Sequence, residues 1–590
     1  MQLFLKQVIY LLGQDKNKLP FLFIIFLIAS GLDLIGIGLI GAYVALLADV
    51  KISSEIFVKL VRIFEIGSEK EQILLLTGYA LIAVFLVKTI FSIWINRIII
   101  RFSAKQHVRL TSFLMSSFQS LSYVDYIKRN SAEYVYSIHH LSSQYANHVV
   151  SPLLRMVSDG ILIFGVIIFL AVQSPVGLGI LVVLVLVMIL FYDTLFRKKM
   201  AFYGEQCNLA SETILKVVSE AIEGLKEIRI LGKENYFHKK LMKTSNELMF
   251  FSIKSSVVQV SLRYLLELTM ITFVVALVLS AVLLENSIDS LYSDLGVFGV
   301  ACLRLFPTVN TFMQGLTQMR YGKDTVLRLF NDVNRLQKLD MKTSDVLRIL
   351  PKHEKFKSLR LKNLCFFYPQ SKTNIIDDIS FDLKEGESIG FIGASGSGKT
   401  TLLDTVLGLF VPQGGSIEFN GSVLSKHLSE WRDQVAYIPQ QVFLIDDSLR
   451  CNIALGVIEN EIDDIKLDES LHRARLTNVV QSLPDGVETI VGERGIRFSG
   501  GQCQRIALAR AFYHDRSVLI MDEATSALDN ETEQEIINEM ELLKGEITII
   551  VIAHNLKTLK HCHRIYELQN GRIIGMGSYN EIIDLKASQM

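Results

Sequence analysis

The sequence predicts a polytopic α-helical membrane domain, with six transmembrane helices extended into the cytoplasm, followed by an α/β domain that carries a phosphate-binding loop. One observation is that half of the 590 residues are hydrophobic, and nearly all the long apolar runs fall between residues 19 and 316. Another is that residues 350–590 have the mixed composition of a soluble domain. A third is the run Gly393–Thr400, which follows an apolar strand pattern and precedes a helical one.

Residues 328–357 are charged and lose the apolar pattern of the preceding segments. We therefore expect a linker at 336–355, between a transmembrane domain at 1–335 and a soluble domain at 356–590. The six cysteines scatter over both halves without metal-type or redox spacing, which is typical of a reducing compartment. The net charge of zero argues neither for nor against a nucleic-acid partner.

The apolar runs are long enough to cross a bilayer six times. The two longest connections, at 97–151 and 197–254, are rich in Lys and Arg, which places them and both termini in the cytoplasm. Residues 97–120 and 199–250 keep helical periodicity, so we expect the spanning helices to continue there, with turns at 122–136 and 221–233. The expected spans are approximately 19–47, 73–95, 154–172, 176–195, 261–284 and 295–316.

Two further segments are amphipathic. Residues 3–12 are apolar at helical spacing and are flanked by lysines, which predicts a cytoplasmic helix on the membrane surface. In residues 55–66 the apolar side chains gather on one side of a helix, either at the outer membrane surface or as a packed connector.

Six charged residues lie within or at the edges of the expected spans, where a charge at the helix centre costs roughly 2.5–3.5 kcal/mol. Those at the edges can reach the interface or pair with one another. Arg304 sits in mid-span, so we expect it to face a polar cavity, which suits an anionic cargo. The six are Asp33, Lys88, Asp159, Arg263, Glu267 and Arg304.

The glycine-rich run has the form of a phosphate cradle, because a strand, a tight turn and a helix N-terminus aim backbone N–H groups at one point. Lys399 is expected to reach the β- and γ-phosphates, and the Thr400 hydroxyl to bind Mg²⁺. The expected ATP-binding residues of this run are Gly393, Ser395, Gly396, Gly398, Lys399, Thr400 and Thr401.

Polar and aromatic residues follow several other expected strands. Tyr368 ends one strand and could stack on adenine, although such an aromatic is also common in a core. Gln440 follows another strand and could touch Mg²⁺ or the attacking water. A second anion site opens a helix with Ser499, Gly500, Gly501 and Gln502. One nucleotide does not need two such sites on one chain, which indicates two chains facing head to tail.

Catalytic residues are expected at the end of the buried strand pattern 518–522. Asp522 would hold Mg²⁺, and Glu523 would polarise the water that attacks the γ-phosphate. Asp529 ends a turn that could cross the dimer interface. His554 follows the strand pattern 547–552 and could contact the γ-phosphate and orient Glu523.

These residues, in this order and spacing, closely resemble the nucleotide-binding domain of ATP-binding cassette (ABC) transporters. The resemblance covers residues 368–554 and includes the A-loop, Walker A, Q-loop, signature, Walker B, D-loop and His-switch motifs. It implies an ABC-type fold for the second domain, an exporter-type half-transporter that works as a dimer, and coupling helices near 122–136 and 221–233. Two positions depart from the pattern: Phe498 replaces the usual Leu, and Asn555 replaces the common Arg.

The membrane half is similar to bacterial flippases for lipid-linked oligosaccharides. The points of similarity are the opening run at 14–17, the amphipathic helix after the first span, Arg263, and Arg304 within 303–307. This resemblance implies that Arg263 and Arg304 bind pyrophosphate and that 55–66 meets polyprenyl lipid. Pairing with phosphate would explain why costly arginines are kept within the membrane.

The function expected from these observations is ATP-driven export or flipping of a lipid-linked anionic glycan by a homodimer in the bacterial cytoplasmic membrane, with ATP and Mg²⁺ as cofactors. The alternatives are export of another amphipathic cargo, such as a lipid, drug or peptide, and an ATP-gated channel or regulator. The spans exclude the soluble cassette ATPases that act on DNA or in translation, and no nucleic-acid partner is expected.

Overall fold

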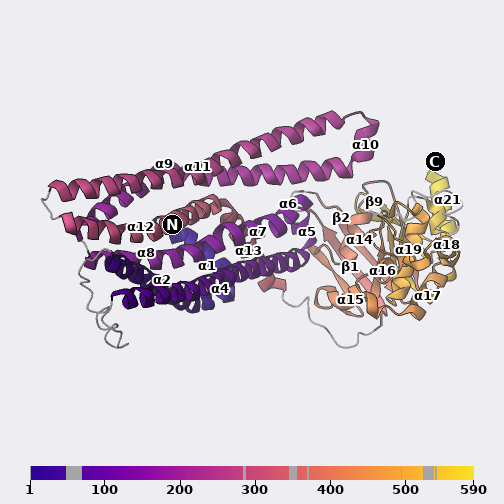
Figure 1. Cartoon of the computed structure of the whole chain (residues 1–590). Helices are drawn as coiled ribbons and strands as arrows, with labels where there is room; N and C mark the ends of the chain where they lie inside the picture. Colours follow the sequence, from indigo (N-terminus) through magenta and orange to yellow (C-terminus); the bar gives the residue numbers. More distant parts are fainter. Residues whose placement is uncertain are drawn as a thin grey trace. The chain divides into compact units, whose positions relative to one another are not determined.

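The structure is a computed structural model, and it divides into two compact units (Figure 1). One contains Met1–Leu121 and Tyr126–Thr343, and the other contains Ser122–Asp125 and Ser344–Met590. The residues described are 2–47, 70–173, 175–283, 288–343, 355–368, 371, 373–492, 495–522, 534, 537–538, 541–553 and 555–589. The amphipathic segment expected at 55–66 lies outside them. The linker expected from residue 336 begins inside a helix that continues to Thr343.

The regular secondary structure described in the first unit is all helical, with short turns between the helices. Five of its described helical segments are long and apolar enough to cross a membrane, and the expected span at 295–316 lies in a further helix, α12. α4 has 50 residues, so it is about 75 Å long and exceeds the ~30 Å hydrocarbon core, as expected for helices that extend beyond the bilayer. The main helices are α1 (Gln2–Leu12), α2 (Leu19–Leu47), α4 (Lys70–Gln119), α8 (Ser151–Gln173), α9 (Pro175–Glu223), α11 (Glu234–Leu283), α12 (Ile288–Tyr321) and α13 (Lys323–Thr343).

Short helices mark the turns between these long ones. α9 and α11 run side by side as a hairpin that α10 (Leu225–Ile230) closes (Figure 1). The other turn holds α5 (Tyr123–Tyr126), α6 (Ser131–Val135) and α7 (Ser142–Tyr145), with π-helical turns at η2 (Tyr136–Leu141) and η3 (Ala146–Val150). The periodicity of the sequence did not predict the π-helical turns, which are frequent at functional sites.

The N-terminal helix α1 is docked on the other helices by one face. Val8, Leu11 and Leu12 are buried, whereas Leu3 is 72% exposed. Arg109 of α4 donates to the backbone carbonyl groups of Leu11 and Leu12, the last two residues of α1. The exposed apolar side is consistent with the expected membrane-surface helix, and its position relative to a bilayer stays a prediction.

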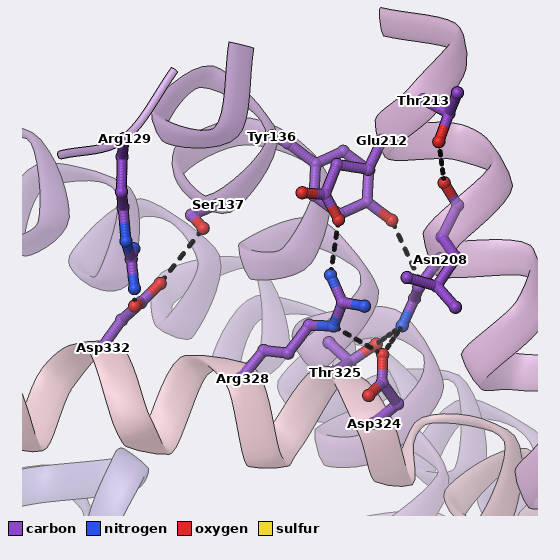
Figure 2. Close-up of polar contacts among 11 residues, drawn as sticks. Arg129, Tyr136, Ser137, Asn208, Glu212, Thr213, Asp324, Thr325, Arg328 and Asp332 are labelled. Atoms are coloured by element: carbon purple, nitrogen blue, oxygen red, sulfur yellow. Dashed lines mark hydrogen bonds and ion pairs between the residues drawn. The ribbon is translucent and has the colours of Figure 1, made fainter. Parts of the chain in front are cut away.

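A polar network joins α13 to α9 and to the η2 turn (Figure 2). The buried Asn208 of α9 accepts from the Tyr136 hydroxyl at 3.2 Å and donates to Asp324 and Thr325 of α13 at 2.9 and 3.1 Å. Arg328 lies between two carboxylates, with Glu212 of α9 at 2.6 Å and Asp324 at 2.8 Å. Because buried polar groups are costly without partners, this network fixes how α9 and α13 face each other.

We expect Glu212 and Arg328 to be energetically coupled. In a double-mutant cycle of Glu212→Gln and Arg328→Gln, the coupling free energy should be about 0.5–3 kcal/mol. Replacing either side chain leaves the half-buried charge of the other without this partner. Thermal unfolding of the full chain in detergent measures it. The matched control is the exposed pair Lys240–Glu220 at 3.5 Å, whose coupling should be near zero. Equal coupling in the two pairs would contradict this interpretation of the network.

The second unit is built on two β-sheets. An antiparallel sheet has the order β2-β1-β4-β5, and a six-stranded sheet has the order β10-β9-β3-β8-β7-β6. Strands β3, β6, β7, β8 and β9 are parallel, and β10 is antiparallel to β9. The strands are β1 (Ser358–Phe366), β2 (Ile376–Lys384), β3 (Ser388–Ile392), β4 (Gly414–Phe419), β5 (Ser422–Val423), β6 (Val435–Ile438), β7 (Val518–Asp522), β8 (Thr548–Ile552), β9 (Arg564–Gln569) and β10 (Arg572–Gly577).

Every residue of β3, β7 and β8 is buried, as the continuous apolar runs of central parallel strands require. Helices pack around the sheets and leave two apolar cores, one around β1, β2 and α14 and one around α17 and α19. The helices of this unit are α14 (Lys399–Val406), α15 (Leu428–Gln434), α16 (Leu449–Ile453), α17 (Asp464–Arg473), α18 (Thr477–Ser482), α19 (Gly500–Tyr513) and α21 (Tyr579–Gln589).

Candidate nucleotide site and intramembrane charges

The glycine-rich run forms the turn between β3 and α14 that the sequence predicted. Gly396 and Gly398 have φ angles of +80° and +102°, which side chains rarely adopt. At Gly393 a Cβ atom would lie 2.2 Å from the backbone oxygen of Leu568. These three positions therefore require glycine for the turn to close this tightly.

Lys399 lies at the first position of α14 and is 4% exposed. Its ammonium group donates to the backbone oxygens of Gly393 at 2.9 Å and Ala394 at 3.1 Å, across the mouth of the loop. The buried Ser397 hydroxyl has no hydrogen-bond partner within the described part of the chain. A helix N-terminus, an ammonium group and an unsatisfied hydroxyl fit a phosphate chain.

Tyr368 lies beside this loop. Its hydroxyl is 3.3 Å from that of Thr401 on α14, and its ring packs edge-on against Phe366 and Phe410. The structure therefore brings Tyr368 next to the P-loop helix, as a residue that stacks on a bound base must be. The same contacts also attach the ring to the core, so adenine stacking stays a prediction.

The carboxyl ends of β3, β7 and β8 meet at one edge of the sheet. Asp522, the last residue of β7, is opposite Ile552 of β8, and Phe391 of β3 is opposite the same residue. Asp522 is 6% exposed, and the Tyr437 hydroxyl on β6 donates to it at 3.4 Å. The sheet therefore places an acidic group at the same edge as the phosphate loop, two strands from β3 with β8 between them.

Asp404 is a further acid at this edge that the sequence did not single out. Burial, with the negative charge of Asp522 as a second cause, raises the pKa of Asp404 to about 6. Burial also raises the pKa of the Tyr437 hydroxyl, again assisted by Asp522. The only sequence signal for this cluster was an acidic residue inside the apolar helix pattern that follows the glycine-rich run.

The other expected nucleotide residues lie on loops and at a helix start. Gln440 is exposed just after β6. Ser499 caps α19: its hydroxyl accepts from the Gln502 N–H group at 3.3 Å, and the Gln502 side chain accepts from the Ser499 N–H group at 2.8 Å. Ser499 and Gly500 are exposed. Glu523, Asp529 and His554 lie outside the described residues. In the sequence, Glu523 directly follows β7, Asp529 is seven positions beyond the end of β7, and His554 is two positions beyond the end of β8.

Several intramembrane charges are paired in ways that the sequence left open. Arg304 of α12 donates to Asp33 of α2 at 2.7 Å, and Lys88 of α4 contacts the same carboxylate at 2.5 Å. Arg263 pairs with Glu267 one turn later on α11 at 3.0 Å, and both side chains are more than half exposed. The structure thus gives Arg263 and Arg304 different surroundings and does not bring them together by any described contact.

Comparison with known proteins found a matching family model for each of the two units. Residues 22–301 match the model of the ABC transporter transmembrane region, and residues 376–526 match that of the ABC transporter. A Ralstonia nicotianae protein named ATP-dependent lipid A-core flippase is 31% identical over 446 residues, which cover 73% of this chain and 72% of that protein. The chain belongs to the ABC transporter family.

Other comparisons agree. A Cupriavidus metallidurans protein named ATP-dependent lipid A-core flippase is 30% identical over 438 residues, covering 73% of this chain and 72% of that protein. The structure of a bacterial Atm1-family ABC exporter with ATP bound has the same fold, with a TM-score of 0.75 at 20% identity, covering 97% of this chain and 96% of that one.

The chain is therefore an exporter-type ABC half-transporter with one transmembrane domain and one nucleotide-binding domain. The expected fold class is confirmed. As a multi-pass membrane protein with an ABC nucleotide-binding domain, it binds ATP and couples its hydrolysis to translocation.

Proposed function

We propose that this half-transporter flips a lipid-linked anionic glycan, of the polyprenyl-pyrophosphate class, across the bacterial cytoplasmic membrane. The observation that carries the proposal is Arg304: it lies in a membrane helix, yet 39% of its side chain is accessible in the single chain. An arginine within a membrane helix is energetically costly, so its presence there points to a function. Its planar guanidinium group matches phosphate oxygens. Arg263 is the second cation proposed for the same headgroup.

The names of the relatives favour a lipid cargo with a carbohydrate part. The Ralstonia and Cupriavidus proteins are named for flipping lipid A-core. A glycan carried on a lipid is the shared chemistry, and it makes lipid A-core the strongest alternative cargo, ahead of drugs or peptides. An ATP-gated channel is the least favoured alternative, because the ATP site carries both an expected base and its expected partner histidine.

For the ATP site we propose the roles that the motifs imply. The P-loop residues from Gly393 to Thr401 hold the phosphates, Tyr368 stacks on adenine, and Thr400, Gln440 and Asp522 hold Mg²⁺. Mg²⁺ neutralises the phosphate charge when it is bound. Glu523 orients the attacking water, and His554 orients Glu523.

We propose that two identical chains form the working unit. Ser499 and Gly500 are exposed, as residues that complete a partner's nucleotide site must be, and Asp529 is proposed to cross the same interface. The tip of the α9–α11 hairpin also leaves apolar side chains uncovered: Ile230 and Leu231 are 74% and 68% exposed. A second copy that covers this tip would remove the exposed apolar surface from water.

The orientation is proposed from the distribution of charge. The Lys- and Arg-rich connections and the nucleotide-binding domain would lie in the cytoplasm, together with both termini. The domain limits 1–335, 336–355 and 356–590 also remain proposals, as do coupling roles for 122–136 and 221–233.

Arg304→Ala tests the proposed cargo. In liposomes that contain a polyprenyl-pyrophosphate glycan, we expect the rate of flipping to fall about tenfold or more, because a charged hydrogen-bond partner of the headgroup is lost. ATP hydrolysis without cargo should be retained. The control is Arg101→Ala, which removes an exposed arginine of α4 and should leave flipping unchanged. Unchanged flipping by Arg304→Ala would refute the proposed role of Arg304.

A further inference from the structure

Three membrane helices converge on one buried carboxylate. Asp33 of α2 is 7% exposed. Its Oδ1 atom is 2.5 Å from Nζ of Lys88 on α4 and 2.7 Å from a terminal nitrogen of Arg304 on α12. Two cations therefore share one oxygen, and the cluster of these three residues carries one positive charge in excess.

Helices α2 and α4 approach each other closely at this cluster. At Gly36, one turn after Asp33, a Cβ atom would lie 3.2 Å from the ring of Phe85 on α4. The ammonium group of Lys88 lies 4.8 Å from the centre of the same ring. Lys88 thus contacts an aromatic face as well as Asp33, and its side chain is 11% exposed.

Arg304 is held less completely. Its side chain is 39% exposed, and its Nε atom is buried without a hydrogen-bond partner in the described part of the chain. One guanidinium nitrogen contacts Asp33, whereas a guanidinium group offers five donors in a planar fork. Asp159 of α8 lies within electrostatic reach of Arg304 but accepts its hydrogen bond from Thr311, at 2.6 Å. Arg304 therefore has donors left for a further anion.

We propose that Asp33 is an internal counter-ion, which the phosphate headgroup of the cargo displaces from Arg304 and Lys88. This inference rests on the proposed function and adds Asp33 and Lys88 to its cargo site. With the site empty, Asp33 neutralises part of a charge cluster that the membrane would otherwise penalise. When a headgroup binds, its oxygens replace the single carboxylate contact with several charge-assisted hydrogen bonds.

The exchange has three consequences. An uncharged lipid cannot displace Asp33, so the counter-ion selects for cargo that carries phosphate. Displacement also breaks the two bridges that tie α2 to α4 and α12, so binding of the headgroup changes how strongly these helices are held together. Because Asp33 competes with the headgroup for Lys88 and Arg304, it also lowers the affinity for cargo.

The test is a titration of ATP hydrolysis in liposomes with a polyprenyl pyrophosphate or with lipid A, and with the uncharged polyprenol as a negative probe. Asp33→Asn removes the competing charge with little change of shape. We expect it to lower the half-stimulating concentration of the polyprenyl pyrophosphate about fivefold or more, the range of ordinary coupling between two ligands. The polyprenol should stimulate none of the variants.

A second comparison covers the case in which Asp33→Asn does not fold, because it leaves two cations without a counter-charge. The double variant Asp33→Asn/Lys88→Gln keeps the net charge of the cluster. Its half-stimulating concentration of polyprenyl pyrophosphate should be about fivefold or more below that of Lys88→Gln alone. The control is Glu220→Gln, which removes the carboxylate of an exposed ion pair on α9 and should change nothing. Free inorganic pyrophosphate, added as a third probe, distinguishes a site for the anion alone from one that needs the lipid.

The outcomes separate the two proposals. If the polyprenyl pyrophosphate stimulates the wild type but every variant has the same half-stimulating concentration, the counter-ion role of Asp33 is wrong and the cargo stands. If only lipid A stimulates, and Asp33→Asn shifts its titration, the cargo is wrong and the counter-ion role stands. If no phosphate-bearing lipid stimulates the wild type or the variants, both proposals are refuted.

Discussion

Replacement of Glu523 by Gln is expected to lower the rate of ATP hydrolysis by about 10²- to 10⁴-fold, the contribution of a positioned general base. β7 ends at Asp522, at the sheet edge that also leads into the phosphate loop through β3, and Glu523 is the next residue in the sequence. Gln keeps the size and the hydrogen-bonding groups but cannot accept a proton from the attacking water. ATP binding should therefore persist.

The measurement pairs ATP hydrolysis with equilibrium binding of labelled ATP in the full-length protein. Glu546→Gln is the control. This exposed glutamate precedes β8, at the end of that strand opposite to the nucleotide site, so its replacement should leave both quantities unchanged. Hydrolysis at the wild-type rate by Glu523→Gln would refute its role as base. Loss of binding together with hydrolysis would assign it to holding the nucleotide instead.

Trp431→Ala should give the largest loss of stability among core substitutions in the nucleotide-binding domain. Trp431 of α15 is fully buried, its ring centre lies within 6 Å of those of Phe356 and Phe419, and its indole N–H group donates to Val406 at 2.8 Å. Val406 is the last residue of α14, so the bond satisfies a carbonyl group at the end of the P-loop helix. Removal of the ring leaves a cavity and costs about 3–5 kcal/mol.

For a domain of this size, that cost lowers the melting temperature by about 6–20 °C. Thermal unfolding of the full chain measures it, with the transition that ATP shifts upward assigned to the nucleotide-binding domain. Trp431→Phe keeps most of the packing but removes the hydrogen bond to Val406. It should lower the free energy of unfolding by only about 1–2 kcal/mol. Trp94→Ala, at a half-exposed tryptophan of α4, is the matched control and should leave this transition unchanged.

Local patterns were sufficient for the fold class of both units. The apolar runs predicted helices longer than a bilayer, and the glycine-rich turn between an apolar strand and a helix predicted the phosphate loop. Both depend on short stretches of chain, where hydrophobic periodicity and the φ angles open to glycine decide the backbone. The π-helical turns at η2 and η3 were missed, because one extra residue in a helical turn leaves the apolar pattern nearly unchanged.

Contacts between distant residues could not be predicted in the same way. The sequence marked Asp33, Lys88 and Arg304 as costly intramembrane charges but offered no basis for pairing them. The paired residues are more than 50 positions apart, and a helical pattern says which face a side chain occupies but not which helix lies opposite. Asp404 was missed for the same reason, since only the sheet order brings it near Asp522.

The sequence by itself determined that this chain has a membrane half and an ATP-binding half, because the bilayer and the phosphate chain each demand a local pattern of residues. Only the tertiary structure decided that Asp33 lies between Lys88 and Arg304, and that Arg328 joins Glu212 to Asp324. Such pairs depend on how whole helices pack, since a charge taken out of water must find its partner on whichever helix the fold places beside it.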